Sequence, residues 1–80
     1  MITEEIRKII VDLLGVEESK VTIDARLIED LNADSLDAVE LAMTLEEHFE
    51  IQVADEEVER MQTVAEIAAT VKSHRPDLEL

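Results

Sequence analysis

Ser35 is the residue of this chain most open to chemistry, and it lies within the segment Leu31–Asp37. From Leu27 to Glu59 the sequence holds twelve aspartates and glutamates and not one lysine or arginine. A serine hydroxyl surrounded by so much negative charge is suited to recognition by a positively charged protein. The sequence therefore favours Ser35 as a point of attachment rather than as a nucleophile that works alone.

A hydrolytic role for Ser35 requires a nearby general base and an oxyanion hole. His48 falls more than three turns further along the same predicted helix, and His74 lies near the end of the chain. The sequence contains no Gly-x-Ser-x-Gly element. We therefore expect no catalytic residue and no enzymatic activity, and we interpret His48 as a solvated helix residue.

A dedicated metal site is not expected either, despite the many carboxylates. The loop of an EF-hand needs oxygen ligands at fixed spacing and a glycine at its sixth position. Gly15 is the single glycine, and no such loop surrounds it. Weak binding of divalent ions would then amount to charge screening.

Length and composition predict one folded domain over residues 1–80. The formal net charge is −14, yet 46% of the residues are hydrophobic, which is too apolar for a disordered acidic tail. This charge repels nucleic acid and anionic lipid and favours basic proteins as partners, although it also serves solubility. Cysteine is absent, no apolar run is long enough to span a bilayer, and the acidic start resembles neither a signal nor a transit peptide. We expect a cytoplasmic monomer without membrane insertion.

Apolar spacing of three and four residues predicts an all-α fold, a small four-helix bundle of three longer helices and one short one. Thr3 is the expected N-cap of the first helix, Gly15 its C′ residue, and Thr63 and Glu66 form a capping box before the last helix. The predicted helices cover about residues 3–14, 35–50, 55–60 and 64–74. The apolar positions of the first helix are Ile2, Ile6, Ile9, Ile10, Leu13 and Leu14.

A long connection over residues 16–33 separates the first two helices. Asp24 is expected to cap a short turn through Leu27. Several of its residues are too apolar for a free loop, and we expect them to pin the connection across the bundle. These residues are Val21, Ile23, Leu27, Ile28 and Leu31.

The second helix is predicted to begin with Asp34 as N-cap and with Asp37 at N3, where its charge suits the helix dipole. Because Asp34 occupies the cap position, Ser35 is not needed for capping. A phosphate ester on Ser35 would meet the positive end of the dipole, which favours it by about 0.3–1 kcal/mol.

Two apolar stripes run along this helix when residues are placed about 100° apart. One stripe faces the predicted core and consists of Ala38, Leu41, Ala42, Leu45 and Phe49. The other consists of Leu36, Val39 and Met43 and is bordered by Glu40, Glu46, Glu47 and Glu50. An apolar centre with a charged rim is typical of a docking surface. The alternative is that Val39 or Met43 is buried against the long connection.

These residues together resemble the acyl carrier protein family. The resemblance rests on Asp34–Asp37, the acidic second helix that follows, Asp55–Glu57 and Thr63–Val64, and it covers nearly the whole chain. It implies a 4′-phosphopantetheine arm, taken from coenzyme A by a holo-carrier synthase (a phosphopantetheinyl transferase) and joined to Ser35. The thiol of the arm would hold acyl groups as thioesters. The surface that it implies for partner enzymes comprises Leu36, Asp37, Glu40, Met43, Glu46 and Glu47, and the second apolar stripe adds Val39 to the expected partner-binding residues.

Two departures from the family pattern stand near the third helix. Ala54 replaces a frequent proline, which removes a fixed φ and is expected to loosen the connection there. Met61 replaces a more usual isoleucine.

The function we expect is that of an acyl carrier protein in type II fatty acid synthesis, served by enzymes with basic docking patches. A carrier for a polyketide or another specialised acyl pathway is the first alternative. An unmodified acidic adaptor, in which Ser35 is only a helix-start residue, is the second.

Overall fold

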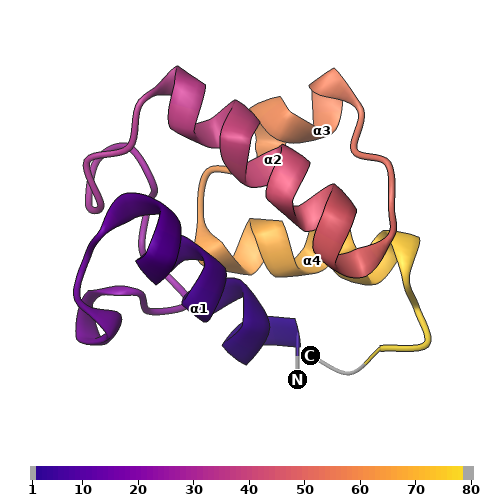
Figure 1. The fold of residues 1–80 in the computed structure, drawn as a ribbon, viewed down its shortest axis with the longest axis horizontal. Coiled ribbons are helices and arrows are strands. Elements are labelled where there is room, and N and C mark those ends of the chain that lie inside the picture. Colours follow the sequence, from indigo (N-terminus) through magenta and orange to yellow (C-terminus); the bar gives the residue numbers. More distant parts are fainter. Residues whose placement is uncertain (1, 79–80) are drawn as a thin grey trace.

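The computed structural model describes residues 2–78 and shows an all-α bundle, so the predicted fold class is confirmed (Figure 1). A short 3-10 turn, Glu18–Lys20, lies in the connection after the first helix. Within residues 2–78 the only β-type pairing is an isolated bridge between Arg26 and Thr63. Met1 and the side chain of Ile2 lie outside the described residues. The helices are α1 (Ile2–Leu14), α2 (Ser35–Phe49), α3 (Asp55–Arg60) and α4 (Val64–His74).

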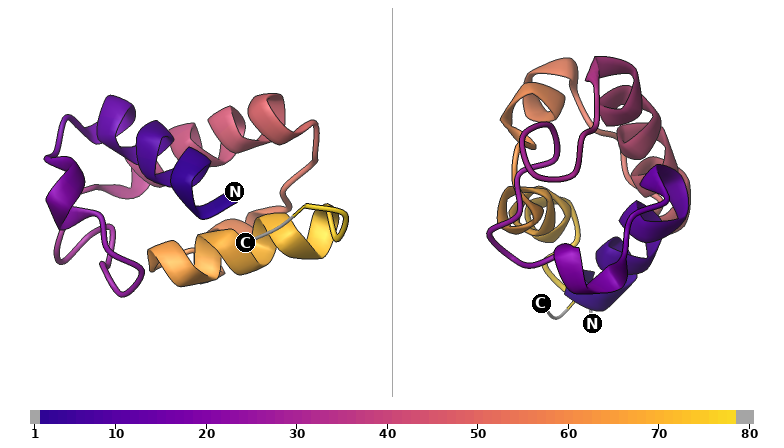
Figure 2. Two further views of the ribbon diagram at one scale, coloured as in Figure 1. Left: turned by 90° about the horizontal axis from the view of Figure 1, so that it is seen from below. Right: turned by 90° about the vertical axis from the view of Figure 1, so that its left-hand side faces the viewer.

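The three longer helices enclose an aliphatic core, and α3 packs beside α2 and α4 (Figures 1 and 2). Each fully buried aliphatic side chain contributes roughly 1.5–3 kcal/mol relative to exposure. Ala38 is only half-buried, because it turns toward a surface hollow beside α3. The largest fully buried side chains are Ile6, Ile10, Val21, Leu41, Leu45, Val64, Ile67 and Val71.

The two ends of α1 differ in how well they were predicted. The helix begins at Ile2, so Thr3 lies inside the first turn and its prediction as N-cap is wrong. Gly15 does terminate the helix: its φ is +66°, and its N–H donates to the Val11 carbonyl at 2.9 Å. Glycine occupies this left-handed conformation at little cost, which explains the stop.

The long connection is held by some of the predicted residues and not by others. Val21, Leu27 and Leu31 are buried, but Ile23 and Ile28 are 46% and 60% exposed, so the prediction that these two pin the connection is wrong. The segment turns repeatedly and therefore has no single apolar face. The capping carboxylate is that of Asp30 instead of Asp24, and it accepts from the Arg26 N–H at 2.9 Å.

Two carboxylates fix the junction between α2 and α3. Glu46 accepts from the Val53 N–H at 2.8 Å, and Glu57 accepts from the Ala54 N–H at 3.0 Å. A proline at position 54 would have no N–H to donate. The expected loosening is therefore not what the structure shows, because Ala54 makes a helix-start hydrogen bond that proline cannot make.

The residues after α4 fasten the far end of α2. The Arg75 guanidinium donates to the Phe49 carbonyl at 2.7 Å and pairs with Asp77 at 3.2 Å. The guanidinium holds the pKa of Asp77 below its usual value, first through the hydrogen bond. The last turn of α2 thus has a cation against its carbonyl end.

Gly15→Ala should lower the free energy of unfolding by about 1 kcal/mol, the cost of placing a Cβ in a left-handed conformation. An added Cβ would meet no atom within 4 Å, so backbone strain is the only cost. Gly15→Asn should lose less, because asparagine tolerates this region. Urea unfolding of the three proteins measures the effect, and an alanine variant as stable as the parent contradicts it.

Candidate functional site

The start of α2 is closed by two reciprocal hydrogen bonds. The Asp34 carboxylate accepts from the Asp37 N–H at 2.9 Å, and the Asp37 carboxylate accepts from the Asp34 N–H at 3.0 Å. This capping box fixes where the helix begins and satisfies one N–H of its first turn.

Ser35 is the first residue of α2 and is exposed. Among residues 2–78, none of the hydrogen bonds engages its hydroxyl. The first N–H groups of a helix point outward and favour an anion at this end. The geometry therefore presents a free hydroxyl where a phosphate ester is electrostatically favoured.

The apolar stripe next to Ser35 faces solvent. Leu36, Val39 and Met43 are 76%, 50% and 60% exposed, so the alternative that Val39 or Met43 is buried against the connection is wrong. Within the described residues, no ion pair or hydrogen bond occupies the carboxylates of Glu40 and Glu47. An exposed apolar strip beside unpaired carboxylates has the composition of a docking surface.

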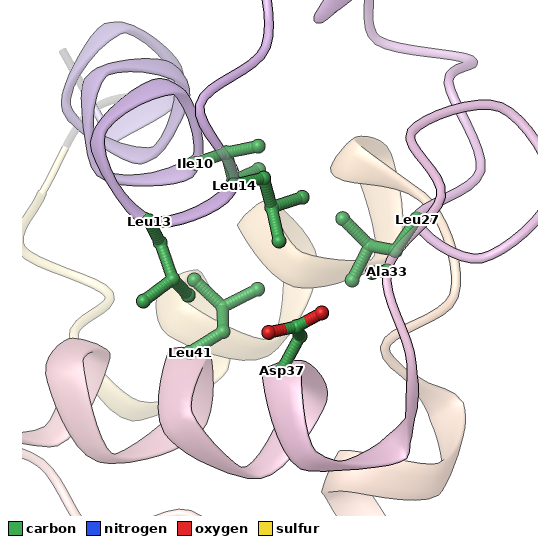
Figure 3. Close-up of a pocket in the computed structure, with 7 residues that line it drawn as sticks. All are labelled: Ile10, Leu13, Leu14, Leu27, Ala33, Asp37 and Leu41. Carbon is green, nitrogen blue, oxygen red and sulfur yellow. The ribbon is translucent and has the colours of Figure 1, made fainter.

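Two carboxylates predicted for that surface serve the fold. Asp37 is half-buried, and Figure 3 shows its carboxylate pointing from α2 toward leucines of α1 and of the connection. The space among these side chains has no room for a water molecule. Glu46 holds the Val53 N–H. A docking role for Asp37 and Glu46 stays a prediction, whereas Glu40 and Glu47 are available for one.

A surface hollow of about 390 Å³ opens beside Ser35, between the start of α2, the connection and α3. The sequence did not predict it, because its walls come from three separate segments that show no common period. Met61, which departs from the family pattern, is buried at its wall. We call it the Ser35 hollow, and its lining residues are Arg26, Leu27, Ile28, Glu29, Ser35, Ala38, Val39, Val58, Glu59, Met61 and Gln62.

The α3 wall of this hollow is held by a hydrogen bond between a carboxylate and an imidazole. Glu57 of α3 lies 2.8 Å from Nε2 of His74, the last residue of α4. The Ala54 N–H lowers the pKa of Glu57 most, and the hydrogen bond from His74 lowers it further. None of the residues of α3 is fully buried, so the polar contacts of Glu57 hold the helix together with the partly buried Val58, which packs against the core.

The remaining predictions about chemistry concern metals, histidines and membranes. His48 is half-exposed and lies 3.5 Å from Glu5, which suits a surface residue. In the described part of the chain, no group of three or more acidic, histidine or cysteine side chains is arranged to hold a metal ion. Over residues 2–78, no helix has the length and apolar character needed to cross a membrane.

This fold and this exposed serine define a small helical carrier domain. Residues 4–71 match the family described as "Phosphopantetheine attachment site". The chain is 59% identical over 71 residues to the acyl carrier protein of Akkermansia muciniphila, with 89% of each chain covered. The chain belongs to the acyl carrier protein family, whose members carry groups on a covalently bound 4′-phosphopantetheine and are not enzymes.

The fold of this chain also matches that of a solved structure. A Mycobacterium tuberculosis protein described as an acyl carrier protein superposes with a TM-score of 0.85 at 26% identity, covering 91% of this chain and 97% of that one.

The residues around Ser35 fit such a prosthetic group. The hydroxyl is exposed, the helix start favours its phosphate, and the Ser35 hollow offers an apolar wall alongside. When bound, the group supplies the thiol that this cysteine-free chain lacks.

Glu57→Gln should destabilise the protein at pH 5 by about 0.5 kcal/mol, the usual value of a partly exposed ion pair. Glutamine keeps an oxygen for the Ala54 N–H but loses the charge that faces His74. Because the folded pKa of Glu57 is lowered, its stabilisation is present above the unfolded pKa and is lost as pH falls through the folded value.

The difference between parent and variant should therefore shrink from pH 5 to about pH 3. Urea unfolding at both pH values measures it, and the exposed neighbour Glu56→Gln is the control. A loss of equal size at both pH values would show that packing, not charge, is responsible.

Proposed function

We propose that this chain is the acyl carrier protein of type II fatty acid synthesis, in the cytoplasm, with the arm attached at Ser35. The observation that carries the proposal is the exposed Ser35 hydroxyl at a capped helix start, followed at once by an exposed apolar stripe with unpaired carboxylates. The family supports the prosthetic group. The strongly acidic α2 favours fatty acid synthesis over a specialised pathway.

The chain itself contributes position and no chemistry to the loading of Ser35. The Ser35 oxygen forms the bond to the phosphorus that carries the pantetheine, the pyrophosphate bond of coenzyme A breaks, and adenosine 3′,5′-bisphosphate leaves. The partner must supply the base that takes the hydroxyl proton. His48 lies about 20 Å further along the helix axis, at 1.5 Å per residue. His74 is engaged by Glu57. The activity we propose therefore depends on recognition by a transferase, and Asp34 acts as the residue that keeps Ser35 free of capping.

Incubation of the apo-protein with coenzyme A and a broad-specificity phosphopantetheinyl transferase should add the mass of one phosphopantetheinyl group. Ser35→Ala should add none, because alanine offers no oxygen. Intact-mass spectrometry reads both, and Ser73→Ala is a control that retains Ser35. No gain, or a gain that survives Ser35→Ala, would leave the unmodified adaptor as the better description.

The pathway is tested after loading. A type II fatty acid synthase reconstituted from discrete enzymes should elongate acyl groups on the loaded protein, and thioesters on the arm are read by mass. Loading at Ser35 without elongation would favour the carrier of a specialised pathway.

Glu47→Lys should slow association with the transferase about tenfold at low salt, because complementary charge acts mainly on the association rate. Asp12→Lys makes the same charge change on the exposed surface of α1 and should have a much smaller effect. The difference in association rate between the two variants should shrink as the salt concentration rises, since the electrostatic screening length falls to about 3 Å at 1 M salt. Equal rates for both variants at low salt would argue against α2 as the docking surface.

A further inference from the structure

Ile28 is an exposed isoleucine in the wall of the Ser35 hollow. It is 60% exposed, while its neighbour Leu27 and the nearby Leu31 are buried and anchor the connection. Val39 of α2 and Ser35 line the same hollow. The fold therefore does not need Ile28 for its core and places it beside the attachment site.

The turn that carries Ile28 is held by three backbone hydrogen bonds. The Leu27 N–H donates to the Gln62 carbonyl at 2.9 Å, and the Ala33 N–H donates to the Leu27 carbonyl at 2.9 Å. The Arg26 carbonyl accepts from the Asp30 N–H at 2.8 Å. A contact offered from a pre-ordered turn loses little entropy on binding.

The charge around Ile28 indicates what it contacts. Glu29 and Glu59 line the hollow beside it, and the chain has no lysine or arginine from Leu27 to Glu59. Arg26, the one cation in the wall, is paired with Glu29 at 2.8 Å. The complementary surface has an apolar centre and a basic rim. A second copy of this chain, with a net charge of −14, does not fit that description.

We propose that Ile28 is a docking residue for the basic protein that modifies Ser35, with an apolar side chain of the partner packing between Ile28 and Val39. This rests on the proposed function of Ser35. The docking surface then flanks Ser35 on two sides, with Leu36 and Val39 on α2 and Ile28 on the connection. A partner that contacts both sides positions the Ser35 hydroxyl more firmly than a partner that contacts α2 alone.

The test compares Ile28→Ala with Ile23→Ala in apo-protein. Ile23 is an exposed isoleucine of the same connection that does not line the hollow. The rate of loading by a phosphopantetheinyl transferase gives kcat/KM. Ile28→Ala should lower it about fivefold, mainly through KM, as expected for lost apolar contact area. Ile23→Ala should stay within twofold of the parent. Urea unfolding checks that both variants remain folded.

Salt separates an apolar contact from charge steering. The fivefold loss in Ile28→Ala should persist at 0.5 M salt, about where the loss in Glu47→Lys is screened. Equal losses in Ile28→Ala and Ile23→Ala would show a general effect on the connection and overturn the proposal. An Ile28→Ala variant loaded as fast as the parent overturns it as well.

Other occupants of the hollow give different results. If Ile28→Ala leaves the loading rate of the apo-protein unchanged and affects only the urea unfolding of the loaded protein, the hollow receives the arm, and the proposal is wrong. If the parent sediments as a dimer that Ile28→Ala dissociates, a second copy occupies it, and the proposal is wrong. If the parent itself takes up no arm, the proposed function fails first, and that failure is visible without any variant.

Discussion

The hydrogen bonds between Asp34 and Asp37 are the interaction on which the functional surface depends. They set the first residue of α2, and so they determine that Ser35 is exposed and free of capping. From that start the helical period turns Leu36, Val39 and Met43 outward while Leu41 and Leu45 enter the core. One local pair of bonds thus fixes both the hydroxyl and the direction of the stripe beside it.

The excess of acid is tolerated because many carboxylates bind backbone N–H groups. Asp30, Asp34, Asp37, Glu46, Glu57 and Glu66 all accept such bonds. Asp34, Asp37, Glu57 and Glu66 do so at helix starts, where unpaired donors and the positive dipole end favour a negative charge. Asp30 and Glu46 bind N–H groups of the connections instead. Of the other carboxylates, those of Glu40 and Glu47 lie on the exposed side of α2, with no hydrogen bond or ion pair within the described residues. Some carboxylates therefore stabilise the fold, while others remain free for recognition by a partner.

Helical periodicity and capping rules predicted what depends on local sequence. The starts of α2 and α4, the stop at Gly15 and the two stripes of α2 follow from residues within one or two turns. The exposure of Ile23 and Ile28 could not be predicted, because a segment that turns repeatedly has no period to read. The inward position of Asp37 and the hydrogen bond that the Val53 N–H donates to Glu46 could not be predicted for another reason. Both depend on which groups the folded chain brings near a carboxylate, and its charge alone does not reveal them. The Ser35 hollow needs three segments brought together, which only the tertiary structure supplies.

Val39 connects the two surfaces that serve Ser35. It belongs to the outward stripe of α2 and also to the wall of the Ser35 hollow. The opposite wall is α3, a six-residue helix without a buried residue, held at its start by Glu57 and through it by His74. Beyond these polar contacts, the partly buried Val58 packs α3 against the core, and so small an apolar contact means a low local cost of opening. A contact on Val39 therefore involves both the outward stripe of α2 and the wall of the Ser35 hollow.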